Sequence, residues 1–129
     1  MNKQHLPTVL FVEDDVAILN LLRRLSAPLA CTSLFAADGE AALGLCARQQ
    51  IDIVISDFLM PGMTGLALLS TVARQWPQTR RVLVSGHPRT FFAEDELEDV
   101  VVVPKPWRPG ELREVLDTMI ADVVARAAS

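Results

Sequence analysis

The sequence predicts an α/β protein in which a parallel β-sheet is covered by helices on both faces. Four short runs are almost wholly apolar and rich in β-branched residues, which is typical of strands buried on both sides. Segments with helical spacing of apolar residues lie between these runs. A β-α unit repeated five times in this way implies parallel strands joined by right-handed crossovers. The 129 residues are expected to form a single domain over 1–129.

The expected strands differ in how apolar they are. A weaker and more polar run at 32–36 suits a strand at the edge of the sheet. The four strongly apolar runs are 9–12, 51–55, 82–84 and 100–103.

Four helical patterns fill the connections, and two of them follow a candidate capping aspartate. Asp15 and Asp38 stand where an N-cap is expected, and Pro109 is well placed to begin the last helix. The stretch between Ser85 and Val100 is less regular, and a short helix is expected there. The other apolar patterns cover 18–29, 41–46, 66–72 and 112–123.

The net charge and the length of the apolar stretches argue against two classes of function, nucleic-acid binding and membrane association. The net charge of −4 argues against direct nucleic-acid binding, which needs a basic face. The first apolar stretch, 9–12, is too short for a signal-peptide core or a membrane span. We therefore expect a cytoplasmic protein that does not associate with a membrane.

Polar side chains stand where the expected strands end. The carboxyl ends of parallel strands share one edge of the sheet, so these groups are expected to converge in one crevice. They are Glu13, Asp14 and Asp15 after the first strand, Asp57 after the third, Ser85 after the fourth and Lys105 after the fifth.

Clustered carboxylates of this kind need a cation. At about 5 Å and an effective dielectric near 20, each pair repels by roughly 3 kcal/mol. Oxygen ligands without histidine or cysteine favour Mg²⁺, which could hold a phosphate donor against Asp57. A carboxylate can attack phosphorus to form an acyl phosphate. Lys105 and the metal would then neutralise the phosphoryl oxygens, to which Ser85 could donate a hydrogen bond.

Four motifs in order resemble the response regulator receiver domain of bacterial two-component systems. They are FVEDD after the first strand, SDFLMPGMTG around Asp57, VLVSG ending at Ser85-Gly86, and PKPW around Lys105. The resemblance covers about 8–124, which we take as the core of the domain. It implies a doubly wound, flavodoxin-like five-stranded sheet in the order 2-1-3-4-5, and a cis bond between Lys105 and Pro106.

The resemblance also implies roles for the candidate residues. Asp57 would accept a phosphoryl group from a histidine kinase or phosphotransfer protein, Ser85 would move toward that group, and Lys105 would pair with it. The implied metal ligands are Asp14 directly, Glu13 mostly through a water, Asp57, and the backbone carbonyl of Leu59. The protein would be a signalling phosphoacceptor that catalyses only its own phosphorylation and dephosphorylation. It could stand alone or belong to a larger regulator or hybrid kinase, act on an output domain, or dimerise through the last strand and helix.

Two departures leave the output surface open. Receivers usually carry an aromatic residue three positions before the lysine, where this chain has Val102, and 89–99 is unlike their fourth helix. Both departures leave the phosphate-accepting chemistry intact. Two alternative functions stay open on other grounds. One is a degenerate receiver that only binds partners, and the other is a Mg²⁺-dependent aspartyl-phosphate phosphatase of the haloacid dehalogenase type. The second needs a D-x-D pair that Asp57-Phe58-Leu59 lacks.

Several other residues near the expected site have more than one possible position or role. His87 could lie at the mouth of the site or be an ordinary loop residue. Phe91 and Phe92 could belong to the core or to a contact surface, and Trp107 is expected at the rim of the site. The acidic run 94–99 is read as a solvated face, with a docking patch as the alternative.

Overall fold

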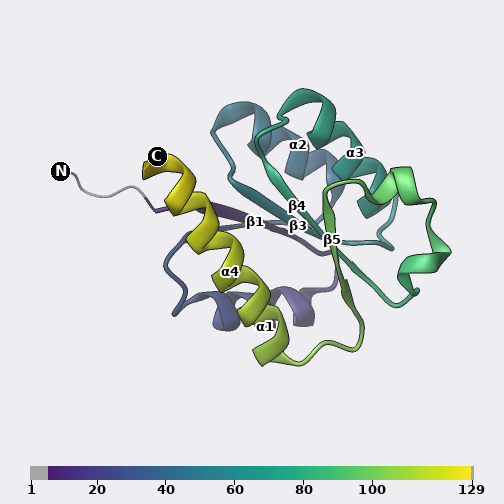
Figure 1. Ribbon diagram of the computed structural model, residues 1–129. Coiled ribbons are helices and arrows are strands. Elements are labelled where there is room, and N and C mark those ends of the chain that lie inside the picture. The colour runs from purple at the N-terminus through teal and green to yellow at the C-terminus, as the bar shows by residue number, and fades with distance from the viewer. Residues whose placement is uncertain (1–5, 129) are drawn as a thin grey trace.

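The fold is a five-stranded parallel sheet in the order β2-β1-β3-β4-β5 (Figure 1). This computed structural model describes residues 6–128, so the ends of the expected 1–129 domain lie outside the described residues. All four neighbouring strand pairs are parallel, which confirms the predicted fold class and strand order. The strands are β1 (Thr8–Val12), β2 (Thr32–Ala36), β3 (Ile53–Asp57), β4 (Arg80–Ser85) and β5 (Val100–Pro104).

Within residues 6–128, four α-helices cover the two faces of this sheet. Helices α1 (Val16–Ser26) and α4 (Pro109–Ala128) lie on one face, and α2 (Gly39–Arg48) and α3 (Gly65–Gln75) lie on the other (Figure 1). Because strand side chains alternate between faces, the strands contribute to two separate hydrophobic clusters, one under each helix pair. No helix among residues 6–128 is both long enough and apolar enough to span a membrane.

The helix starts follow the predicted capping signals. The Asp15 carboxylate accepts hydrogen bonds from the backbone N–H groups of Ala17 and Ile18, at 2.8 and 3.2 Å. Asp38 accepts one from Ala41 at 2.7 Å, and Pro109 is the first residue of α4. These contacts satisfy amide groups that have no partner within the helix, and they confirm the predicted caps.

The connection between β4 and β5 differs from the prediction. One short helix is expected there, and the segment instead contains two short 3₁₀ helices, η1 (Arg89–Phe91) and η2 (Glu94–Leu97). Phe92 and Leu97 are its buried side chains, and two anchors five residues apart do not share one face of an α-helix. Phe91, by contrast, is 58% exposed, so the two phenylalanines divide between core and surface.

Two strand ends are also shifted from the prediction. The strand expected at 51–55 is β3, so Asp57 is its last residue and does not follow it. Ser85 likewise closes β4. Parallel pairing explains the shift, because Asp57 lies opposite Val84 and Ser85 opposite Pro104 in the register.

Candidate functional site

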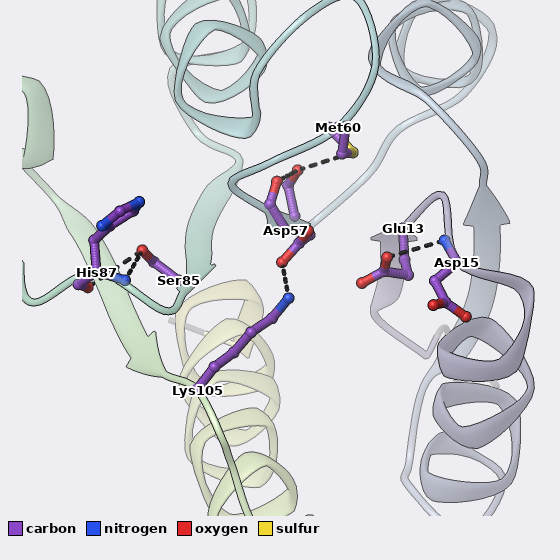
Figure 2. Close-up of polar contacts among 8 residues, drawn as sticks. Glu13, Asp15, Asp57, Met60, Ser85, His87 and Lys105 are labelled. Carbon is purple, nitrogen blue, oxygen red and sulfur yellow. Dashed lines mark hydrogen bonds and ion pairs between the residues drawn. The ribbon is translucent and has the colours of Figure 1, made fainter.

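The candidate site lies at the carboxyl edge of the sheet, where β1, β3, β4 and β5 end (Figure 2). Asp57 occupies its centre, because β3 lies between β1 and β4 in the strand order. Its carboxylate is buried, with 7% of the residue exposed. The parallel topology thus brings the chain segments after these strands to one place, as the sequence predicted.

An acidic cluster is the first feature of this edge. Glu13, Asp14 and Asp57 each offer a carboxylate oxygen, and these oxygens all lie within 4.8 Å of one another. Glu13 is buried and Asp14 is exposed. Three oxygen donors of this kind, with no sulfur or nitrogen ligand among them, suit a hard divalent cation such as Mg²⁺.

Burial and like charges both act on Glu13. Desolvation raises the pKa of its carboxyl group, and the neighbouring charges of Asp57 and Asp14 raise it further. The hydrogen bond from the backbone N–H of Asp15, at 3.0 Å, and the positive charge of Lys105 oppose this rise. Keeping these neighbouring carboxylates ionised therefore costs free energy when no cation is bound.

We expect Glu13→Gln to raise the melting temperature of the metal-free protein at pH 7 by roughly 2–5 °C. Because the pKa of Glu13 is raised in the folded protein, its carboxyl group contributes to stability at low pH, where it is protonated. This stabilisation is lost as the pH rises through the pKa of the folded state. The difference from wild type should be smallest below the ordinary value of 4.5 and grow above it.

Thermal unfolding from pH 4 to 8 in EDTA, and again with excess Mg²⁺, measures the effect of Glu13→Gln. The variant should gain less from Mg²⁺ than the wild type does. Identical pH dependence of the two proteins would contradict this view of the acidic cluster.

Lys105 faces the acidic cluster from the other side. Its Nζ forms an ion pair with Oδ1 of Asp57 (Figure 2). The backbone N–H of Lys105 donates to the carbonyl of Ser85 at 2.8 Å, which fixes the start of this loop to β4. The peptide bond between Lys105 and Pro106 is cis, as predicted. Asp57 therefore lies between two carboxylates and one ammonium group.

Ser85 is near the cluster, but its hydroxyl is turned away from Asp57. The Oγ atom accepts a hydrogen bond from the backbone N–H of His87 at 2.9 Å and lies 3.2 Å from the His87 carbonyl, to which it donates. Figure 2 shows both contacts on the side away from Lys105. To reach a group attached to Asp57, Ser85 would have to give up these bonds.

The loop after β3 lies next to the site, because it follows Asp57 directly. Leu59 lies in it, two residues after Asp57, with an exposed side chain, and its carbonyl ligand role stays a prediction. Ser56 was missed by the sequence reasoning, although it is fully buried and its hydroxyl donates to the Asp57 carbonyl at 2.9 Å. It is the first residue of the SDFLMPGMTG motif, but the sequence gives no sign that its hydroxyl is buried against the Asp57 carbonyl. Trp107 lines a small cavity beside Glu13 and Asp57, consistent with the expected rim position.

Comparison with known proteins identifies the class. The family model of the response regulator receiver domain matches residues 9–117, so the chain belongs to this family. It is a receiver domain of two-component signal transduction, which confirms the resemblance found in the sequence.

Individual relatives agree with this assignment. The hydrogenase transcriptional regulatory protein HoxA of Cupriavidus necator is 32% identical over 123 residues, covering 92% of this chain and 24% of that protein. The signal receiver domain of an HD domain-containing protein from Pseudomonas fluorescens Pf-5 is 32% identical, with a TM-score of 0.83 over 92% of this chain and 97% of that one. Response regulator protein TrrA of Thermotoga maritima, solved in complex with Mg²⁺-BeF, is 23% identical and shares the fold, with a TM-score of 0.78 over 88% of this chain and 98% of that chain. The chain spans about a quarter of the length of HoxA.

Proposed function

We propose that Asp57 accepts a phosphoryl group from a histidine kinase or phosphotransfer protein in a Mg²⁺-dependent reaction. The observation that carries this proposal is the position of the buried Asp57 carboxylate between the Glu13–Asp14 pair and the ammonium group of Lys105. A nucleophilic carboxylate needs neighbours that neutralise the incoming phosphate, and this arrangement supplies them.

The chain's own residues would divide the work in the following way. One Asp57 oxygen attacks phosphorus, the bond to the donor's histidine nitrogen breaks, and an acyl phosphate forms. Lys105 exchanges its carboxylate partner for a phosphoryl oxygen, and Ser85 turns from His87 to donate to another. The side chains of Glu13, Asp14 and Asp57 and the carbonyl of Leu59 would hold Mg²⁺, which would neutralise charge on the phosphoryl oxygens. The fold shared with TrrA, a protein solved with Mg²⁺-BeF, supports this choice of metal.

The proposed function also includes a cellular location, an output and an oligomeric state. The chain would act in the cytoplasm, where ATP-dependent kinases operate, and would catalyse only its own phosphorylation and dephosphorylation. It would control an output domain or partner protein, either as a separate protein or within a larger regulator or hybrid kinase. A homodimer through β5 and α4 is compatible with this role, because β5 is an edge strand that leaves Val101 exposed.

Acetyl phosphate provides the test of phosphoryl acceptance. The wild type should gain one phosphoryl group by intact mass in the presence of Mg²⁺, and should gain none in EDTA or as Asp57→Asn. Beryllofluoride with Mg²⁺ should change the Trp107 fluorescence of a Trp76→Phe protein only when Asp57 is present. Absence of any adduct would favour a degenerate receiver. Sustained hydrolysis of p-nitrophenyl phosphate would favour the phosphatase alternative.

His87→Ala is expected to change the rate at which the acyl phosphate decays by roughly 2- to 10-fold, which is the effect of about one weakened hydrogen bond. The backbone of His87 holds Ser85, and its ring stacks on Phe91 with centroids 4.1 Å apart, so removal of the ring should alter water access and the position of Ser85. Intact mass followed over time after removal of acetyl phosphate measures the decay. Equal decay of the wild type and His87→Ala would rule out this role.

A further inference from the structure

A groove of about 740 Å³ lies beside the candidate site, between α3 and the segment 91–99. We call it the α3–η2 groove. Phe58, Phe91 and Phe92 line one part of it, and Leu66 and Ala67 of α3 line another. An apolar groove beside a helix is the kind of surface that receives an amphipathic helix of another protein.

The aromatic part of the groove is partly open to solvent. Phe91 is 58% exposed, although its ring packs against Phe92 at 5.1 Å between centroids. Phe92 in turn contacts Phe58 at 4.9 Å. An exposed phenylalanine supported by two less exposed rings provides an anchor for an apolar side chain of a partner.

The rim of the groove is acidic. Asp95, Glu96, Glu98 and Asp99 line it and are all exposed. Within residues 6–128, no ion pair engages these carboxylates. Two arginines, Arg74 and Arg81, also line the groove and keep their positive charge, because the groups they bond, the Ser70 and Thr71 hydroxyls and the carbonyl of Glu98, are neutral. The four carboxylates of the lining outnumber them, so the lining carries a net negative charge.

The negative charge of the rim determines which kind of partner segment can bind in the groove. A positively charged segment is attracted to a rim in which carboxylates outnumber guanidinium groups, and an acidic one is repelled. A second copy of this chain fits less well, because the chain carries a net charge of −4. The groove is therefore suited to a partner helix with apolar residues on one side and Lys or Arg on the other.

Aromatic contacts connect the groove to Asp57 and Ser85. Phe58 follows Asp57 directly, and its ring lies 5.8 Å from that of His87. His87 bonds to the Ser85 hydroxyl through its backbone and stacks on Phe91 through its ring, with 12° between the planes. These contacts form a continuous path from the Ser85 hydroxyl through His87 to Phe91 in the groove.

We propose that the α3–η2 groove binds a basic amphipathic helix of a partner protein, and that phosphorylation of Asp57 changes its affinity for that helix. This inference rests on the proposed function, whose partner chemistry and regulation it specifies. It also gives the chain an aromatic connection to its surface where Val102 provides no ring. By linkage, the bound helix changes the phosphorylation equilibrium by the same factor.

Fluorescence anisotropy of a labelled synthetic peptide tests this proposal with the full chain. The probe is a helix of about 18 residues with Leu at i, i+3, i+4 and i+7 spacing and Lys elsewhere, compared with the same helix carrying Glu for Lys. Neutralising the rim with Asp95→Asn and Glu98→Gln, or removing the anchor with Phe91→Ala, should weaken Lys-peptide binding by about tenfold. The matched control, Glu114→Gln with Asp117→Asn on α4, should change it less than about twofold.

Activation by beryllofluoride and Mg²⁺ tests the regulation. The affinity of the wild type for the Lys peptide should change by about fivefold or more, and that of Asp57→Asn should not change. Equal binding of the Lys and Glu peptides, or equal loss in the α4 control, would overturn the inference. Loss of wild-type self-association in the groove variants would assign the groove to a second copy, with the same consequence.

A separate readout distinguishes failure of the proposed function. If acetyl phosphate adds a phosphoryl group to the wild type but peptide affinity stays the same, only the present inference fails. If no phosphoryl group is added, the proposed function itself fails and the regulation fails with it.

Discussion

Gly65→Ala is expected to destabilise the domain by about 1–3 kcal/mol and to slow phosphorylation of Asp57 by about 10²-fold. A Cβ atom at Gly65 would collide with the backbone carbonyl oxygen of Asp57 and would lie 2.9 Å from both the Asp57 carbonyl carbon and Ser56 Oγ. The carbonyl group belongs to the last residue of β3, so relief of the collision must move Asp57 itself. Urea unfolding measures the stability, and the rate of mass gain with acetyl phosphate measures the reaction.

Gly44→Ala is the matched control for this substitution. Gly44 lies in α2, and the atom nearest to its added Cβ would be Nη1 of Arg48, at 3.5 Å. Ala in this helix should stabilise the protein by about 0.5–1 kcal/mol and leave phosphorylation unchanged. If Gly65→Ala behaved like this control in both measurements, close approach of α3 to Asp57 would not be required.

The fold could be predicted from the sequence because its signals are local and agree with one another. Strands that are buried on both faces appear in the sequence as apolar runs rich in β-branched residues. The N-caps of α1 and α2 appear as aspartates that precede helical patterns. The cluster of Asp57, Glu13 and Lys105 followed from topology, since parallel strands bring their carboxyl ends together. Both features depend on burial pattern and topology rather than on individual side-chain contacts.

The remaining features depend on tertiary contacts that leave no periodic signal. The segment after β4 turns twice as 3₁₀ helix because Phe92 and Leu97 are its buried anchors, and their spacing matches no regular element. The bonds of Ser85 to His87 and the stacking of His87 on Phe91 arise from how this loop folds back over the site. The α3–η2 groove follows from the same loop.

Lys105→Met is expected to slow phosphorylation of Asp57 by about 10²–10³-fold while the protein remains folded. The substitution keeps an apolar stem of similar length and removes the ammonium group that faces Asp57. The loss of stability should be only about 1 kcal/mol in the metal-free protein, because the Lys105 side chain is 32% exposed and water screens the pair. The two measurements are the mass gain with acetyl phosphate and the urea unfolding curve. Arg108→Met, three residues further along the same loop and exposed, is the matched control and should change neither.

A double-mutant cycle separates the two roles of this lysine. In metal-free protein, Asp57→Asn removes the negative partner, so Lys105→Met should cost less stability in the Asp57→Asn background than in the wild type. In the Lys105→Met protein with Asp57 intact, Mg²⁺ should recover part of the lost stability, because a cation at the acidic cluster replaces some of the missing positive charge. It should not recover the rate, since a metal bound by the carboxylates leaves the Lys105 side of Asp57 without a donor. Recovery of both would mean that Lys105 contributes charge alone, and that its position opposite Glu13 and Asp14 has no role in the transfer.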